Sequence, residues 1–247
     1  MPNWTVLQKE IANTKPEGDN SPVDIVRRKY LAKLHDLTKR NIIAYYSGFL
    51  SKPKIEGVEI NDEDKNGFML CVHKLEKDKG LDLFLHTPGG DGAATESLIF
   101  YLKQMFGENI RAIIPQIAMS AGTIIACSCK SILMGKHSNL GPVDPQFGGI
   151  PAIGITKELE MAYKQITTDN RYALVWNPIL GNITPSFVQQ CEWAIERGRD
   201  LISTALESGM FKDAPADKKK ALIERVVKRL SELTDNKTHS KPLLSGN

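Results

Sequence analysis

Short apolar runs alternate with amphipathic segments over the first half of the chain. Runs rich in β-branched and other apolar residues predict strands at 41–50, 81–86, 110–115 and 131–134. Apolar positions at helical spacing predict helices at 23–38, 60–79, 93–106 and 120–129. Repeated strand and helix units of this kind form mainly parallel sheets covered by helices. The pattern therefore predicts an α/β fold, with a mainly parallel sheet and flanking helices.

The second half of the chain has a different pattern. Residues 135–151 contain too much glycine and proline for regular structure, and we expect a shaped loop or a β-turn ribbon there, over the functional site. Helical segments are predicted at 155–166, 186–210 and 217–233, and Trp176-Asn177-Pro178 and Gly181 should separate the first two. The C-terminal part is thus expected to be helical.

Length and composition fit one domain with short extensions. A chain of 247 residues with 41% hydrophobic residues can bury a substantial core. We expect a single domain over 22–235, a flexible N-terminal arm over 1–21 and a C-terminal tail over 236–247. The arm carries a polar stretch broken by proline and glycine at 15–20, which is typical of a segment that does not join the core.

The charge of the chain is nearly balanced. Its formal net charge is +3, from 32 basic and 29 acidic residues. Basic residues gather at 218–220 and 225–229, but at helical spacing they are typical of a solvated helix face. We therefore expect no nucleic-acid partner.

The cysteines and the apolar runs bear on metal binding and location. Cys71, Cys127, Cys129 and Cys191 have no metal-ligand spacing, so we interpret them as small buried hydrophobic residues and expect no metal site. The N-terminus lacks the pattern of a signal peptide, and no run reaches the roughly 18 apolar residues of a membrane-spanning helix. A cytoplasmic protein without membrane insertion is expected.

A serine stands at the start of the predicted helix 120–129. In one interpretation Ser120 caps this helix, and its hydroxyl accepts a hydrogen bond from a first-turn N–H group. In the other interpretation it is a nucleophile. Unpaired N–H groups and the positive end of the helix dipole would then stabilise the negative oxygen that develops during acyl transfer. The serine alone leaves both interpretations open.

A second turn of small residues follows the predicted strand 81–86. Pro88-Gly89-Gly90 leads from this strand into the helix 93–106. At the carboxyl ends of parallel strands, such turns place backbone N–H groups close to a ligand, and glycine permits the close approach. Together with the serine turn after the next strand, this turn favours a functional site at one edge of the sheet.

Three motifs resemble the signatures of Clp-class serine peptidases. They are HTPGGDGAA at 86–94, AMSAGTIIA at 118–126 and LGPVDPQ at 140–146, in the order found in that class. The chain is most similar to the serine dehydrogenase proteinase family, which is related to signal peptide peptidase A. The resemblance extends over 27–233 and implies a Clp-protease/crotonase-like fold. It also implies self-association into trimers or larger rings that shelter the active site between subunits.

The resemblance also implies an activity and the residues that carry it. The activity would be hydrolysis of peptides or unfolded proteins. The sequence contains nothing that predicts a nucleotide or another cofactor, so we expect ATP-independent hydrolysis without a cofactor. An acyl-enzyme would form on Ser120, and the N–H groups of Gly89 and Ala121 would hold the oxyanion. Gly90 would shape the turn and let the substrate backbone lie alongside as an added strand.

The general base is expected to be a lysine. In the signal peptide peptidase relatives the base is a lysine on a later helix, and the segment GIPAIGITK maps it onto Lys157, with Lys164 as the second choice. Clp proteases use a histidine instead, and its place in the motif alignment falls near Asp144, which favours the lysine. His239 in the C-terminal tail is a further alternative.

Two other functions stay open at this point. The crotonase fold uses the same paired N–H groups to hold thioester oxyanions, so the chain could be an acyl-CoA enzyme. A non-catalytic scaffold of the same fold, which binds peptides or partner proteins, is the other. A covalent adduct on a serine would distinguish the peptidase from both.

Overall fold

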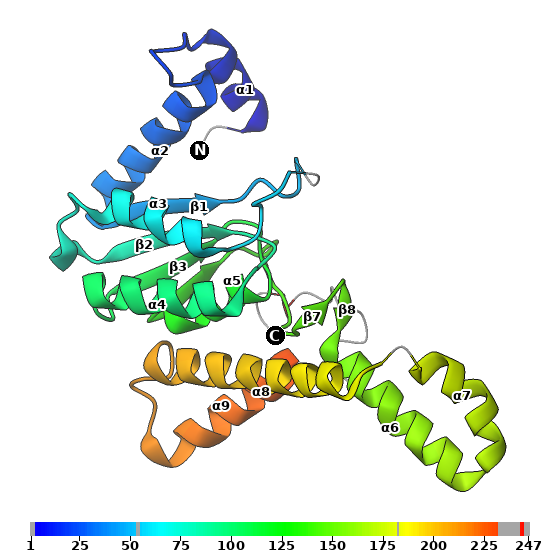
Figure 1. The fold of residues 1–247 in the computed structure, drawn as a ribbon. Coiled ribbons are helices and arrows are strands. Elements are labelled where there is room, and N and C mark those ends of the chain that lie inside the picture. The colour runs from blue at the N-terminus through cyan, green and yellow to red at the C-terminus, as the bar shows by residue number, and fades with distance from the viewer. Residues whose placement is uncertain (1–2, 53–54, 182, 232–242, 245–247) are drawn as a thin grey trace.

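A four-stranded parallel sheet lies at the centre of the molecule (Figure 1). The computed structural model describes residues 3–52, 55–181, 183–231 and 243–244. The strands are β1 (Asn41–Tyr46), β2 (Leu81–His86), β3 (Ile110–Ile114) and β5 (Ser131–Met134), in the order β1-β2-β3-β5. Every pair in this sheet is parallel, which confirms the predicted sheet type.

Helices precede or connect the strands, and several of them begin at local capping groups. The helix α2 (Pro22–Thr38) precedes β1, and the connecting elements are α3 (Asp62–Val72), the 3₁₀ turn η1 (Lys77–Lys79), α4 (Gly92–Phe106) and α5 (Ala121–Ser128). Asn61 caps α3 in a capping box with Asp64, and Asp91 caps α4 by accepting a hydrogen bond from the N–H of Ala94. α3 and α4 cross the face of the sheet that is turned toward the viewer in Figure 1.

The core fills the space between the sheet and these helices. Leu81, Leu83 and Leu85 of β2 are fully buried, as expected for a strand covered on both faces. Every residue of α5 is buried as well. A helix without a polar face has to be enclosed on all sides, and α5 therefore lies between two packing partners.

Beyond the carboxyl ends of the strands, the chain forms short pieces of sheet. β4 (Ile117–Ala118) pairs in parallel with β6 (Asn139–Leu140), and β6 is antiparallel to β9 (Leu243–Leu244). β7 (Gln146–Phe147) and β8 (Ile150–Pro151) form an antiparallel ribbon. The glycine- and proline-rich segment thus contains the ribbon that the sequence predicted.

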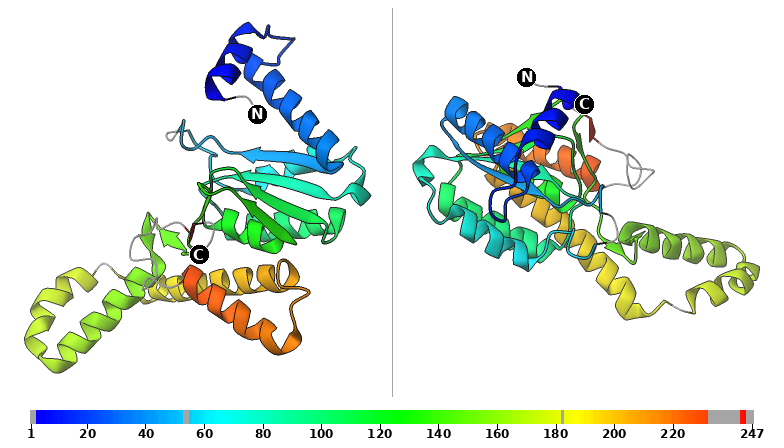
Figure 2. Two further views of the ribbon diagram at one scale, coloured as in Figure 1. Left: turned by 180° about the vertical axis from the view of Figure 1, so that it is seen from behind. Right: turned by 90° about the horizontal axis from the view of Figure 1, so that it is seen from above.

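From residue 152 to residue 231 the chain is mainly helical, as expected. The elements are α6 (Ala152–Thr168), the 3₁₀ turn η2 (Asn170–Tyr172), α7 (Ala173–Leu180), α8 (Pro185–Ser208) and α9 (Ala216–Ser231). α6 and α7 project away from the sheet in every view of Figures 1 and 2. α8 contacts α5 and α9, and a second hydrophobic core forms around Ile124, Ile202 and Leu206.

Within the described ranges, none of these helices combines the length and the apolar character that a bilayer crossing requires.

The N-terminal segment contains a helix that the sequence analysis did not predict. Residues 4–13 form the helix α1 (Trp4–Asn13), capped by the side chain of Asn3. Glu10 of α1 accepts hydrogen bonds from Lys29 and from the Tyr30 hydroxyl of α2. The structure therefore has a capped helix in this stretch, and a charged side chain connects it to α2. The flexibility of the arm stays a prediction. The domain limits at 22 and 235 stay predictions.

α7 also differs from the prediction, which placed a break at Trp176-Asn177-Pro178. Pro178 lies inside the helix, where it removes a single backbone hydrogen bond. The buried Trp176 compensates for this loss, because its Nε1 donates a hydrogen bond of 2.8 Å to Oε1 of Gln165 on α6. Tertiary contact with α6 thus overrides the local effect of the proline.

A buried carboxylate ties the amino ends of the strands together. Asp82 of β2 is fully buried, and its Oδ1 accepts a hydrogen bond of 2.6 Å from Nε of Arg40, next to β1. Its Oδ2 accepts one of 2.5 Å from Nη2 of Arg111 on β3. Arg40 also donates to the backbone carbonyls of Leu81 and Asn109. This cluster lies at the opposite end of the sheet from Ser120.

Replacing Asp82 by alanine should lower the free energy of unfolding by about 3 kcal/mol, because two guanidinium groups lose their shared acceptor. The loss should stay near the lower end of the range for broken buried pairs, since Arg40 and Arg111 keep some contact with water. Urea denaturation measures this difference. Glu76→Ala is the matched control, because the ion pair of Glu76 with Lys79 is exposed and should contribute less than about 0.5 kcal/mol. Equal losses in the two variants would contradict a structural role for Asp82.

The four cysteines differ in their exposure to solvent. Burial raises the pKa of Cys127 and of Cys129 to about 12, so neither forms thiolate at pH 7. Cys191 is buried, whereas Cys71 on α3 is exposed, so the expectation of burial is wrong for Cys71. N-ethylmaleimide should add once to the native chain at pH 7 and not at all to Cys71→Ser, as intact-mass spectrometry would show. Rapid addition to Cys71→Ser would contradict the burial of the other three thiols.

Candidate active site

Ser120 connects β4 to α5 in a backbone conformation that few side chains tolerate. Its φ is 46° and its ψ is −113°, and among the described non-glycine residues only Lys39 shares a positive φ. Such a conformation costs roughly 1–3 kcal/mol and tends to occur at functional sites. Ser120 holds the N-cap position of α5, but its side chain makes no capping hydrogen bond. The interpretation of its hydroxyl as a capping group is therefore wrong.

The turn Pro88-Gly89-Gly90, which we call the glycine turn, contacts the turn at Ser120, which we call the serine turn. No side chain lies between the two turns. The N–H of Thr87 donates to the carbonyl of Ile117, and the N–H of Met119 donates to the carbonyl of Thr87, so that β2 is continued alongside β4. A Cβ atom on Gly89, whose φ is 106°, would lie 2.8 Å from Cβ of Ser120. Glycine is therefore required at this position, both for the conformation and for the space.

The two glycines of the turn present their N–H groups differently. The N–H of Gly89 donates a hydrogen bond of 3.1 Å to Oγ1 of Thr87. Gly90 pairs with Ile60, which bonds to the carbonyl of Gly89 and to the N–H of Asp91 at 2.8 Å each. In a parallel pair of this type the N–H and C=O of Gly90 itself point to the other side. Neither group of Gly90 has a hydrogen-bond partner among the described residues.

A second N–H group is available at the start of α5. Ala121 is the first residue of this helix, and within the described part of the chain no acceptor contacts its N–H. Its nitrogen would lie 3.3 Å from a Cβ atom on Gly89. The hydroxyl of Ser120, the N–H of Ala121 and the glycine turn therefore meet at the positive end of the helix dipole, where a developing oxyanion is stabilised.

Ser120 lines two cavities that share Gly90 and Pro145. The first, which we call the inner cavity, has a volume of about 240 Å³ and lies between the start of α4, α5 and α8. The second, which we call the ribbon cavity, has a volume of about 530 Å³ and reaches Gly148 and Gly149 at the tip of the β7–β8 ribbon. Ser120 is thus accessible from two sides, and the predicted ribbon lies beside it.

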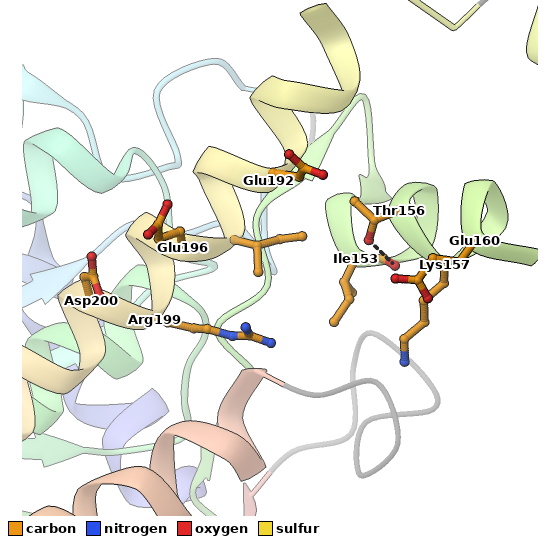
Figure 3. Close-up of a pocket in the computed structure, with 9 residues that line it drawn as sticks. Ile153, Thr156, Lys157, Glu160, Glu192, Glu196, Arg199 and Asp200 are labelled. Carbon is orange, nitrogen blue, oxygen red and sulfur yellow. Dashed lines mark hydrogen bonds between the residues drawn. The ribbon is translucent and has the colours of Figure 1, made fainter. Parts of the chain in front are cut away.

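Lys157 lies in a different part of the structure. It is exposed on α6 and lines neither the inner cavity nor the ribbon cavity. It lines a separate pocket between α6 and α8, which has a volume of about 550 Å³. Figure 3 shows Lys157 and Glu160 on the α6 side of this pocket, and Glu192, Glu196 and Asp200 on the α8 side. The single chain therefore does not bring Lys157 next to Ser120, and Lys164 is exposed further along α6.

Two other histidines and Asp144 lie around the site in different positions. His86 is buried at the end of β2, where Nε2 lies 3.2 Å from Oε1 of Gln116 and the ring stacks on Tyr46. Nε2 of His137 lies 3.0 Å from the carbonyl oxygen of Pro115. Asp144 lines the ribbon cavity together with Ser120. His239 lies outside the described residues.

Two threonines support the site and were missed by the sequence analysis. Thr87 fixes the glycine turn through the bond from Gly89. The hydroxyl of Thr123 lies 3.0 Å from the carbonyl oxygen of Ala118 and accepts a hydrogen bond of 3.1 Å from the N–H of Gly141. Thr123 thereby fixes the loop that begins the third motif against α5. A buried hydroxyl in an otherwise apolar helix needs hydrogen-bond partners. A threonine within the apolar helix was therefore the sequence signal that could have identified Thr123.

Comparison with known proteins gives a family match and two relatives. The sequence model of a family described as "ClpP-like SDH-type serine proteinase" matches residues 15–192. The uncharacterized protein MJ0137 of Methanocaldococcus jannaschii is 33% identical over 150 residues, which cover 59% of this chain and 51% of that protein. The uncharacterized protein MJ1495 of the same organism is 36% identical over 117 residues, which cover 47% of this chain and 38% of that protein. The chain therefore matches about half of one relative and less of the other.

Substitutions of Ser120 distinguish two interpretations of this residue. One is a nucleophile in a strained backbone conformation, and the other is a helix cap. Ser120→Ala should change the free energy of unfolding by less than about 0.5 kcal/mol, because no capping bond is lost. Ser120→Gly should be more stable than Ser120→Ala by about 1 kcal/mol, because glycine tolerates the positive φ. Urea denaturation of both variants measures these differences.

Ser21 provides the control, because its side chain accepts a hydrogen bond of 3.2 Å from the N–H of Asp24 at the start of α2. Ser21→Ala should cost about 1 kcal/mol, the usual cost of a lost cap. A loss of similar size in Ser120→Ala would restore the capping interpretation for Ser120.

Proposed function

The chain belongs to the ClpP-like SDH-type serine proteinase family, and we propose that it is a serine peptidase that forms an acyl-enzyme on Ser120. The observation that carries this proposal is the strained, uncapped Ser120 in contact with the glycine turn. A helix cap would have no need of this backbone conformation, whereas a nucleophile gains access to substrate from it. The alanine N–H next to it supplies one oxyanion donor.

The second oxyanion donor comes from the glycine turn. The family resemblance implied this role for Gly89, but the N–H of Gly89 already donates to Oγ1 of Thr87. The N–H of Gly90 has no partner among the described residues, and Gly90 lines both cavities at Ser120. We therefore propose that the N–H groups of Gly90 and Ala121 hold the oxyanion. The role of Gly89 is to allow the close contact with Ser120. The carbonyl of Gly90 can accept a hydrogen bond from a substrate strand.

The proposed reaction has two steps. The base takes the proton from Oγ of Ser120, Oγ bonds to the carbonyl carbon of the peptide, and the carbonyl oxygen becomes the oxyanion. Collapse of this intermediate breaks the C–N bond, and the protonated base donates its proton to the leaving amine. Water then attacks the ester on Ser120, loses a proton to the same base and releases the acid, while Oγ regains its proton.

The proposed base is Lys157, with Lys164 as the alternative. α6 begins directly after the β7–β8 ribbon, and residues of that ribbon line the ribbon cavity at Ser120. Because Lys157 lies outside both cavities, this assignment requires α6 to approach a serine in the assembled or substrate-bound protein. A lysine acts as a base only in its neutral form, so the approach must also remove it from water.

The proposed substrates are peptides or unfolded proteins, and the proposed working form is a homo-oligomer of three or more subunits. The projecting helices support self-association, because Leu174, Val175 and Ile179 on α7 are largely exposed. Apolar side chains that gather on one projecting element mark an interaction surface. Sheltering the serine between subunits would keep folded proteins away from it.

A fluorophosphonate should form one covalent adduct per chain, detected by intact-mass spectrometry. Ser120→Ala should give no adduct and should lower peptide hydrolysis to background, because it removes the nucleophile. Lys157→Ala should slow labelling by about 10²-fold or more, the usual contribution of a general base. Lys164→Ala tests the alternative base on the same helix, and it should label at the rate of the unaltered chain if Lys157 is the base.

Slow labelling in Lys164→Ala with normal labelling in Lys157→Ala would move the base to Lys164. An adduct on a chain that carries Ser120→Ala would overturn the assignment of the nucleophile. No adduct on the unaltered chain would overturn the peptidase proposal, and would favour an acyl-CoA enzyme or a peptide-binding scaffold.

A further inference from the structure

The proposed oxyanion donors lie on two separate segments of the chain. The N–H of Gly90 belongs to the glycine turn after β2, and the N–H of Ala121 belongs to the serine turn after β4. The distance between the two donors therefore depends on the contacts that join these segments. Donors stabilise an oxyanion only when both point at its position from hydrogen-bond distance. Each contact between the two segments thus bears on reactivity.

One such contact is made by the side chain of His86, the last residue of β2 before the chain enters the glycine turn through Thr87. Its Nε2 lies 3.2 Å from Oε1 of Gln116, the residue that precedes β4 and the serine turn. An amide oxygen only accepts hydrogen bonds, so Nε2 of His86 carries the hydrogen and donates it. The carbonyl of Gln116 accepts a hydrogen bond of 2.7 Å from the N–H of Asn139, which fixes the backbone of Gln116. The two segments are thus joined by a side-chain bond next to the backbone pairing of Thr87.

The ring of His86 also contacts the loop that follows β1. It stacks on Tyr46 with ring centroids 4.5 Å apart, and the ring centroid of Phe49 lies 5.2 Å away. The same loop leads to Ile60, whose N–H and C=O bond to the residues on either side of Gly90. His86 therefore contacts both neighbours of the glycine turn, which are this loop and the segment with the serine turn.

Packing alone does not account for a histidine at this position. His86 is 3% exposed, and its Nδ1 has no hydrogen-bond partner among the described residues. A buried acceptor without a donor destabilises a fold, and an apolar side chain of similar size would avoid this cost. The bond from Nε2 to Gln116 is the contribution that an apolar side chain cannot make.

We propose that His86 is a positioning residue, which sets the distance between the two oxyanion donors through its bond to Gln116. This inference rests on the proposed function. His86 lines neither of the cavities at Ser120, so it acts through the two turns and not by touching the substrate. Loss of its bond should therefore slow the reaction without weakening the binding of a substrate. Misplacement of reacting groups by about 1 Å lowers rates by up to about a hundredfold.

The test measures inactivation by the fluorophosphonate, in which Oγ of Ser120 loses its proton to the base and bonds to phosphorus, and fluoride leaves. The phosphoryl oxygen gains negative charge and takes the place of the oxyanion. The dependence of the rate on probe concentration gives kinact, the limiting rate constant, and KI, which reports the binding of the probe. His86→Leu should lower kinact at least about tenfold and leave KI within about twofold, because the donors act on the transition state alone.

Gln116→Met should lower kinact in the same way, because it removes the acceptor of the same bond. Gln116 is exposed, so this variant should fold even if a change at the buried His86 prevents folding. The double variant should be no slower than either single variant, since all three lose one bond. His86→Gln should restore kinact to within about threefold of the unaltered chain, because its amide nitrogen replaces Nε2 as the donor.

His137→Leu is the matched control. Nε2 of His137 lies 3.0 Å from the carbonyl oxygen of Pro115, so this change removes a similar contact at the same edge of the sheet without involving the glycine turn. The kinact of this variant should equal that of the unaltered chain. Urea denaturation separates positioning from stability, because the midpoint of Gln116→Met should stay within about 0.3 M of the unaltered chain.

A purely structural role of His86 would lower the urea midpoint and leave kinact of the folded variants unchanged. That result would overturn the inference, whereas continued labelling of Ser120 would uphold the proposed function. Losses in kinact that add up in the double variant, or an equal loss in His137→Leu, would overturn the inference as well. If the fluorophosphonate does not label the unaltered chain, the proposed function falls and the inference falls with it.

Discussion

The structure of the site depends on a contact between two turns that has no room for side chains. Gly89 meets Ser120, and Gly122 meets Thr87, where a Cβ atom would lie 2.5 Å from Cγ2 of the threonine. The backbone pairing of Thr87 with Ile117 and Met119 holds the turns at this distance. Glycine at these points is therefore a steric requirement rather than a source of flexibility. The positive φ of Ser120 and the arrangement of the free N–H groups follow from the same close approach.

α5 transmits this constraint to the rest of the molecule. Its Ala121 and Ile125 belong to the core under the sheet, while Ile124 and Cys127 belong to the core formed with α8 and α9. Because both sides of the helix are enclosed, a shift of Ser120 would disturb two packed regions at once. The inner cavity lies where these regions meet, so one helix fixes both the serine and one wall of the cavity.

The sequence predicted those features that local physics decides, and missed those decided by tertiary contact. Alternating apolar runs sufficed for the sheet and its helices, and the position of Ser120 at a helix start was visible as well. The hydrogen bond from Gly89 to Thr87 was not visible, because the sequence does not show which of two adjacent glycines keeps a free N–H group. α7 likewise depends on the hydrogen bond from Trp176 to Gln165, which no local sequence pattern predicts.

The two ends of the sheet have opposite roles. At the amino ends, Asp82 binds arginines from two directions and holds neighbouring strands in register. At the carboxyl ends, the chain keeps a strained serine, uncapped N–H groups and cavities on both sides of it. Strain of roughly 1–3 kcal/mol persists only where the surrounding structure leaves the chain no alternative. The enclosed helix α5 provides that restraint, and the chain can therefore keep Ser120 in a strained conformation at this edge without loosening the fold.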